Sequence, residues 1–236
     1  MLKTLTARRR RRRGLASEVK YWRDWIATRG EPWPWDFSRR FDATSPLQER
    51  LILERLDTLE DGVVSILDVG AGPASSLGTM HPEKQIVLTA VDPLASEYAV
   101  LLEEAGLEAP VPTLPVAGER LRAEFGPASF DFVYARNSLD HAADPALVVE
   151  QMLEVVRPGG FVILRHYESE GEAGSYRNLE QWNFRVVDGR LHIWSRRSDI
   201  DLNAHVAASA TCEASVETDP DVPVWVTAVL RRRAER

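Results

Sequence analysis

Cysteine is almost absent from this chain. Its 236 residues include one cysteine, Cys212, so no disulfide can form within the chain. No apolar run approaches the roughly 18 residues that a membrane-spanning helix needs, and none has the form of a secretory signal. We therefore expect a cytoplasmic protein without a transmembrane segment.

Compact groups of metal-ligating residues are also missing. The five histidines are far apart in the sequence: His81, His141, His166, His192 and His205. Their spacing matches no metal-ligand motif, and the glycine-flanked serine of hydrolases is absent. We therefore expect neither a metal site nor a serine nucleophile.

Positive charge is scarce outside the first residues. The chain has 29 basic and 36 acidic side chains, and seven of the basic ones lie in residues 1–13. An acidic body disfavours a broad nucleic-acid face, because phosphates are neutralised by clustered lysine and arginine. Residues 1–14 are predicted to be a basic, disordered tail. Within it, Arg8 to Arg13 is the one block suited to an anionic surface.

The length favours one main domain with an added N-terminal part. Residues 15–62 are predicted to form a helical and aromatic cap. It comprises a helix from Ser17 to Gly30, an extended loop rich in tryptophan and proline over 30–46, and a helix from Leu47 to Leu59. Residues 63–236 are predicted to form the main domain.

From Val63 onward, apolar strands alternate with helices, which is typical of a parallel sheet covered on both faces. The expected strands are 64–69, 86–91, 111–116, 130–135 and 160–166, and the expected helices 75–80, 94–105, 119–125 and 145–155. Asp188-Gly189 then predicts a hairpin over 183–195, inside an insertion of about 168–198. A short helix over 201–208 and two antiparallel strands, 211–218 and 224–231, are expected to complete the domain.

A glycine turn follows the first strand in Ile66-Leu67-Asp68-Val69-Gly70-Ala71-Gly72. Glycine permits positive φ and close approach of the backbone to a ligand, and a following helix would present free amides. Asp92, after the second strand, suits the two hydroxyls of a ribose. These features predict a nucleoside cofactor, and they leave open a dinucleotide or S-adenosylmethionine.

Three later segments separate these alternatives: Phe130 to Ala135, Asn137-Ser138-Leu139-Asp140-His141, and Val155 to Gly160. Their succession resembles the class I S-adenosylmethionine-dependent methyltransferases with a methyltransferase type 11-like domain, over about residues 64–166. The resemblance implies a Rossmann-like, doubly wound, mostly parallel seven-stranded α/β sheet with an antiparallel last strand. It also implies S-adenosylmethionine as the cofactor.

The resemblance also assigns cofactor-binding positions. They are Asp68, Gly70, Ala71, Gly72, Asp92, Pro93, Glu119 and Asn137. The chain departs from the family pattern after the third strand, where an acid that contacts adenine is replaced by Ala117. Glu119 is the candidate substitute.

Catalysis of methyl transfer to a hydroxyl needs a group that takes up the proton. His141 is the first candidate for a general base, because an unperturbed imidazole titrates near neutrality. Asp140 either orients that ring or contacts the substrate, although Asp140 and Asp144 equally suit a cap of the helix that begins near Pro145. His166, at the end of the fifth strand, is a second candidate, or else a buried core histidine.

Acceptor contacts are expected from the insertion and from the cap. Gln181, Trp182 and Asn183, with Trp22 and Trp33, suit a hydroxyl-rich or ring-containing acceptor, although the rings also suit core packing. The predicted function is methylation of a small molecule or biosynthetic intermediate, at oxygen rather than nitrogen. The alternatives are an NAD(P)-dependent oxidoreductase and a non-catalytic S-adenosylmethionine-binding protein.

Overall fold

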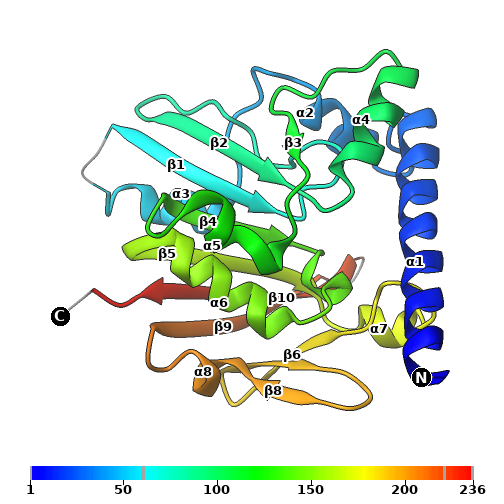
Figure 1. Ribbon diagram of the computed structural model, residues 1–236. Coiled ribbons are helices and arrows are strands. Elements are labelled where there is room, and N and C mark those ends of the chain that lie inside the picture. Colours follow the sequence, from blue (N-terminus) through cyan, green and yellow to red (C-terminus); the bar gives the residue numbers. More distant parts are fainter. Residues whose placement is uncertain (1, 60–61, 220–221, 235–236) are drawn as a thin grey trace.

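A seven-stranded sheet organises the molecule. The computed structural model describes residues 2–59, 62–219 and 222–234, with side chains of the first helix from Arg13 on. The strand order is β3-β2-β1-β4-β5-β10-β9 (Figure 1). These strands are β1 (Val63–Val69), β2 (Gln85–Val91), β3 (Thr113–Leu114), β4 (Phe130–Arg136), β5 (Val156–Tyr167), β9 (Ala210–Asp219) and β10 (Val222–Arg232). β1 to β5 are parallel and β10 is antiparallel, which confirms the predicted fold.

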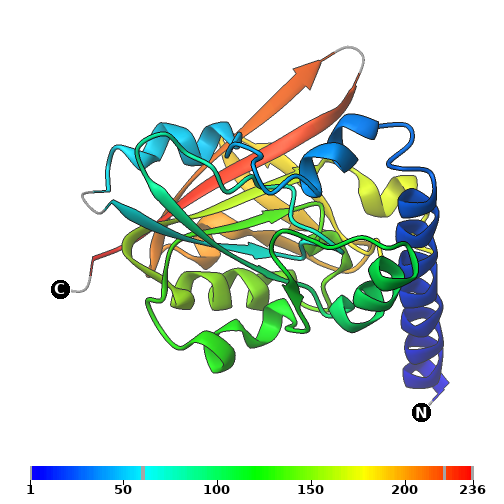
Figure 2. The same ribbon diagram turned by 90° about the horizontal axis from the view of Figure 1, so that it is seen from above.

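Helices cover both faces of this sheet. They are α1 (Leu2–Ala27), α2 (Pro34–Arg40), α3 (Arg50–Leu56), α4 (Ala95–Glu104), α5 (Leu121–Phe125), α6 (Pro145–Val155), α7 (Glu170–Ala173) and α8 (Leu202–His205), with short 3-10 turns η1 (Gly118–Arg120) and η2 (Leu139–His141). Figure 2 shows α3 on one face of the sheet, and α5 and α6 on the other. α6 has the predicted bounds, because Asp144 caps it by accepting a hydrogen bond of 3.1 Å from the amide of Leu147.

Alternating strand residues fill the two layers. In β1, Leu67 and Val69 pack on the side of α6, whereas Val64 and Ile66 pack on the side of α3. Successive side chains of a strand point to opposite faces, so both faces of this central strand are buried. The carboxyl ends of the parallel strands are thereby fixed relative to one another.

The insertion forms a second, three-stranded antiparallel sheet. Its strands are β6 (Asn183–Val187), β7 (Arg190–Trp194) and β8 (Asp199–Asp201). Asp188 and Gly189 have φ of 50° and 73°, the sign that a two-residue hairpin turn requires at both positions. The predicted hairpin is confirmed, and Phe184 and Ile193 join the core that covers the main sheet.

The expected helix over residues 75–80 is wrong. The segment is a loop held against the chain before α3, where the amide of Leu47 donates to the carbonyl of Met80 at 2.9 Å. A Cβ on Gly78 would lie 2.0 Å from the carbonyl oxygen of Pro46, so the two segments are in close backbone contact. α3, which precedes β1, covers this face instead.

The N-terminal segment also differs from expectation. A disordered tail over 1–14 and a helix from Ser17 were expected, but one helix runs from Leu2 through the arginines to Ala27. Arginine is a good helix former, so the block does not interrupt the helix. The side chains of Arg8 to Arg12 lie outside the described residues, and their predicted contact with an anionic surface stays a prediction.

Smaller differences lie at the ends of other elements. The third strand is short, Thr113–Leu114, and the fifth begins earlier, at Val156. α2 occupies part of the expected loop, with Pro34 in its first turn, where a missing amide costs no helical hydrogen bond. Across the part of the chain that the structure describes, no helix combines the length and apolarity needed to cross a membrane.

Candidate functional site

A cavity of about 890 Å³ opens at the carboxyl ends of β1, β2, β4 and β5. α1 lies across this edge of the sheet (Figure 1), and its residues form one wall of the cavity. Ligands of open α/β sheets bind at this edge, and the volume lies within the range of ligand pockets, about 300–1,000 Å³. Twelve of the predicted site residues line it: Asp68, Gly70, Ala71, Gly72, Asp92, Pro93, Glu119, Asn137, Asp140, His141, Trp22 and Trp33.

Asp92 presents a buried carboxylate held by two backbone amides. Its Oδ1 accepts a hydrogen bond of 2.8 Å from Leu94, and its Oδ2 accepts one of 3.2 Å from Gly72. Burial raises the pKa of Asp92 to about 6, against the opposing effect of these two amides. A carboxylate has about four acceptor sites, so Asp92 keeps acceptor capacity for hydroxyls of a ligand.

The glycines of the turn make room for protein neighbours. A Cβ on Gly70 would lie 2.2 Å from the Cβ of Ser138, and one on Gly72 would lie 2.7 Å from the indole of Trp22. Both glycines have positive φ, 75° and 68°. The turn can therefore touch the loop after β4 on one side and α1 on the other, and the expected close approach to a ligand stays a prediction.

Asp68 lies beneath this turn. Its Oδ2 accepts a hydrogen bond of 2.5 Å from the hydroxyl of Ser75, and burial raises its pKa to about 6. The positive charge of Arg40 in α2 opposes this increase in the pKa of Asp68. Arg40 also donates a hydrogen bond of 2.6 Å to the carbonyl of Ala74. Asp68 and Arg40 thus hold the loop after β1 in place of the helix that the segment lacks.

Asn137 and Glu119 line the cavity, and both also brace its walls. Asn137 has φ of 45°, and its Oδ1 accepts a hydrogen bond of 3.0 Å from the amide of Tyr167. This bond ties the end of β4 to the end of β5. Glu119 accepts one of 3.2 Å from the amide of Ala143, just before α6.

Asp140 and His141 form an ion pair at the wall of the cavity. The Nε2 of His141 lies 3.1 Å from Oδ2 of the buried Asp140, and its Nδ1 lies 4.0 Å from Oε2 of Glu18. Burial acts to lower the pKa of His141, but Asp140, Glu18 and Glu180 raise it to about 10. These carboxylates therefore favour the protonated form of His141. A general base would need the neutral imidazole, and that predicted role of His141 stays a prediction.

Glu18 is a site residue that the sequence did not reveal. It lies on α1, lines the cavity, and accepts a hydrogen bond of 2.9 Å from the indole nitrogen of Trp22. Burial raises its pKa above the ordinary 4.5, although His141 and Trp22 oppose the shift. No local pattern marks it, because its partner His141 comes from a distant part of the chain.

His166 does not line the cavity. Its ring is 1% exposed, is stacked on Phe184 with the centroids 4.2 Å apart, and has no hydrogen-bond partner among the described residues. Burial lowers its pKa to about 4, which keeps it neutral. The structure thus places His166 in the core, which was the alternative to a catalytic role.

Gln181, Trp182 and Asn183 also lie outside the cavity lining. The backbone amide of Gln181 donates a hydrogen bond of 2.9 Å to the carbonyl of Asp140. The indole nitrogen of Trp182 donates one of 3.1 Å to the carbonyl of Ala142. Asn183 is fully buried and accepts a hydrogen bond from the amide of Glu172. These residues were expected to contact the acceptor. Gln181 and Trp182 instead hold the insertion against the segment that carries Asp140, and Asn183 joins two parts of the insertion.

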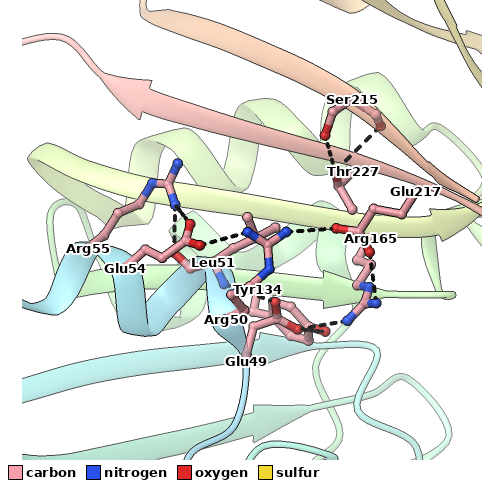
Figure 3. Close-up of polar contacts among 10 residues, drawn as sticks. All are labelled: Glu49, Arg50, Leu51, Glu54, Arg55, Tyr134, Arg165, Ser215, Glu217 and Thr227. Carbon is pink, nitrogen blue, oxygen red and sulfur yellow. Dashed lines mark hydrogen bonds and ion pairs between the residues drawn. The ribbon is translucent and has the colours of Figure 1, made fainter.

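The far wall of the cavity is braced by a polar network (Figure 3). Glu49 accepts a hydrogen bond of 2.9 Å from the hydroxyl of Tyr134 and lies 3.5 Å from Arg165. Arg165 also pairs with Glu217 at 3.2 Å, and Glu217 pairs with Arg50 at 3.0 Å. This network joins the segment before α3 to strands β4, β5 and β9.

The strand order, the acid after β2 and the cavity at the carboxyl edge define a Rossmann-like enzyme that binds a nucleoside cofactor. A family model described as "Methyltransferase domain" matches residues 8–202, so the chain belongs to this methyltransferase family. It is a class I S-adenosylmethionine-dependent methyltransferase. This membership decides against an NAD(P)-dependent oxidoreductase.

Known relatives cover only parts of the chain. A ubiquinone biosynthesis O-methyltransferase of Paracidovorax citrulli is 38% identical over 100 residues, which are 41% of this chain and 41% of that protein. A 2-methyl-6-phytyl-1,4-hydroquinone methyltransferase of Synechocystis sp. is 24% identical over 74% of this chain and 55% of that protein. The chain thus spans about half the length, or less, of these relatives.

A solved structure shows the same fold. The 1,6-didemethyltoxoflavin-N1-methyltransferase of Burkholderia thailandensis superimposes with a TM-score of 0.52 at 18% identity. The match covers 93% of this chain and 89% of that one, and therefore includes the insertion as well as most of the main sheet.

Proposed function

We propose that this methyltransferase transfers a methyl group from S-adenosylmethionine to a hydroxyl of a small-molecule acceptor. The observation that carries the proposal is one cavity lined both by Asp92 and by the group Glu18, Asp140 and His141. One part of the cavity suits a nucleoside, and the other holds a carboxylate and a cation beside each other. The volume of about 890 Å³ is sufficient for a cofactor and a small acceptor together.

The cofactor would be held by the residues that follow β1, β2 and β4. Asp92 would accept hydrogen bonds from the two ribose hydroxyls, and Asp68 with Asn137 would contact the methionine moiety. The turn Gly70-Ala71-Gly72 would shape this part of the site, and Pro93 and Glu119 would lie beside the adenine; all of these residues line the cavity. When bound, the cofactor supplies a methyl group on a positively charged sulfur.

Glu18 and His141 have complementary parts in the transfer. An acceptor hydroxyl must lose its proton as it gains the methyl group, and the carboxylate of Glu18 takes that proton. The imidazolium of His141 stabilises the negative charge that develops on the acceptor oxygen. Asp140 keeps His141 protonated and oriented through the 3.1 Å contact.

α1 contributes more than Glu18 to this site. Trp22 and Tyr21 of the same helix line the cavity, so the helix covers the reacting groups. Exclusion of water strengthens the interaction between His141 and the acceptor oxygen, and it prevents water from competing for the methyl group. The helix thereby acts as both a wall and a source of the base.

Oxygen is favoured over nitrogen as the acceptor atom. A carboxylate beside an imidazolium suits a hydroxyl that ionises, and one of the relatives is by name an O-methyltransferase. A neutral amine needs no base before methyl transfer and gains nothing from a neighbouring imidazolium.

Two measurements test this proposal. Isothermal titration should show binding of S-adenosylhomocysteine and none of NAD. Incubation with methyl-labelled S-adenosylmethionine and a library of phenols and alcohols should yield labelled methyl ethers, and the His141→Ala variant should yield at least about a hundredfold less. Labelled amines without labelled ethers would contradict O-methylation.

A further inference from the structure

Arg136 is an arginine without a polar partner inside the cavity. It ends β4 and lines the cavity at the carboxyl edge of the sheet. Among the described residues, its guanidinium takes part in no hydrogen bond or ion pair. It lies over the ring of Trp225, whose centroid is 5.1 Å away.

The nearby carboxylate is already used by two other arginines. Asp36 binds Arg39 at 2.6 Å and Arg40 at 2.7 Å. Burial acts to raise the pKa of Asp36, but the positive charges of Arg40 and, to a smaller extent, Arg136 lower it. Arg136 therefore lies near Asp36 as well. Three cations thus share one carboxylate, and Arg136 is the one left unpaired.

Arg165, another arginine that lines the cavity, already has ion-pair partners. Arg165 also lies over Trp225, at 4.7 Å, but its charge is matched by Glu49 and Glu217. Among the arginines that line this wall, Arg136 is therefore the one whose guanidinium makes no ion pair or hydrogen bond with the described residues. A partly buried guanidinium of this kind is suited to a carboxylate, which it can bind through two parallel hydrogen bonds.

Aromatic rings surround this charge. Tyr167 packs on Trp225 with centroids 4.1 Å apart, and both line the cavity. At the rim, Tyr21, Trp33 and Trp35 also line the cavity, and each is at least half exposed. Exposed rings lose unfavourable contact with water when a planar apolar group covers them.

We propose that Arg136 binds a carboxylate on the acceptor, and that the aromatic residues beside it hold the acceptor's ring. The acceptor class is then an aromatic acid that also carries the hydroxyl to be methylated. A guanidinium matches the planar carboxylate through two parallel hydrogen bonds. This inference rests on the proposed function, since it specifies the ligand of the same cavity.

The test uses benzoate and benzamide as probes, because they share ring and shape and differ in charge. Both are titrated by ligand-observed NMR into the full chain saturated with S-adenosylhomocysteine. Benzoate should bind at least about tenfold more tightly than benzamide. Arg136→Gln should remove this preference and leave the affinity for S-adenosylhomocysteine unchanged, while Arg136→Lys should keep part of it.

Arg185→Gln is the matched control, since Arg185 lies over Trp194 at 5.3 Å but outside the cavity; it should retain the full preference. Equal binding of the two probes to the unmodified chain, or binding of neither, would overturn the inference without touching the proposed function. A loss of S-adenosylhomocysteine affinity in Arg136→Gln with the benzoate preference intact would overturn it too, because Arg136 would then bind the cofactor's own carboxylate. Failure of the unmodified chain to bind S-adenosylhomocysteine would instead contradict the proposed function.

Discussion

The amide of Gly72 donates a hydrogen bond of 3.2 Å to Oδ2 of Asp92, which joins the turn after β1 to the acid after β2. The two segments that are predicted to hold the cofactor are therefore held together by the protein's own hydrogen bond. Preorganisation of this kind lowers the entropy lost on binding. The same hydrogen bond, together with the one from Leu94, fixes the orientation of the buried Asp92 carboxylate.

Removal of the Asp92 carboxylate should weaken cofactor binding strongly. Asp92→Ala leaves two ribose hydroxyls without their charged acceptor, a loss of about 1.5–3 kcal/mol. Isothermal titration with S-adenosylhomocysteine measures the effect. Asp144→Ala is the control: Asp144 caps α6 away from the cavity, so this change should cost stability and not affinity. Equal affinities of Asp92→Ala and the unmodified chain would exclude the proposed role.

Cofactor affinity should increase as the pH rises through about 6. Burial holds the pKa of Asp92 and of Asp68 at about 6 instead of 3.8, so both are largely protonated at pH 5 and ionised at pH 7. In the absence of the cofactor, the raised carboxyl pKa values contribute to the free energy of unfolding at low pH. This contribution is fully present below pH 3.8 and is lost as the pH rises through 6. The cofactor binds the ionised form, so the gain in melting temperature with S-adenosylhomocysteine should grow between pH 5 and 7.

The Asp92→Asn variant separates the two carboxyls. It should keep only the part of the pH dependence that belongs to Asp68, and it should bind less tightly than the unmodified chain at pH 7. A gain in melting temperature that is flat from pH 5 to 7 in the unmodified chain would show that neither carboxyl titrates on binding.

Turnover should depend on opposite protonation states of Glu18 and His141. Glu18 must be ionised, so kcat should rise with pH through a pKa above 4.5; His141 must be protonated, so kcat should fall as the pH passes about 10. Glu18→Gln should remove the acid limb and His141→Ala the alkaline limb, each lowering kcat by about 10²–10⁴. His205→Ala, outside the cavity, should change neither limb. A histidine that acts as a neutral base would instead give a rate that increases up to pH 10.

A side chain at position 70 should lower the free energy of unfolding. Alanine there would meet Ser138 at 2.2 Å in addition to the strain of φ 75°, whereas Gly106 has φ 63° with open space around it. Gly106→Ala therefore reports strain alone, about 1 kcal/mol, and Gly70→Ala should cost at least about 1 kcal/mol more. Urea unfolding measures both. Equal losses would show that the contact with Ser138 adjusts freely.

Local features were predictable from the sequence, and long-range ones were not. The bounds of α6 and the β6–β7 hairpin follow from neighbouring residues, a capping Asp144 and the Asp188-Gly189 turn. The loop over 75–80 could not be predicted, because α3, which precedes β1, covers this face of the sheet in place of the expected helix. No sequence pattern pointed to Glu18 or Arg136, because their proposed roles depend on residues that are distant in the sequence and that only the fold brings close to them. His141 was recognised, and its neighbour Asp140 raises its pKa most; the added effects of Glu18 from α1 and Glu180 from the insertion depend on the fold.

The most direct measurement is mass spectrometry of a small-molecule cell extract incubated with the protein and methyl-labelled S-adenosylmethionine. The account predicts a labelled methyl ether of low mass, formed by the unmodified chain and lost in Asp92→Ala and His141→Ala. Label found only on amines, only on RNA or protein, or on no product at all would contradict it.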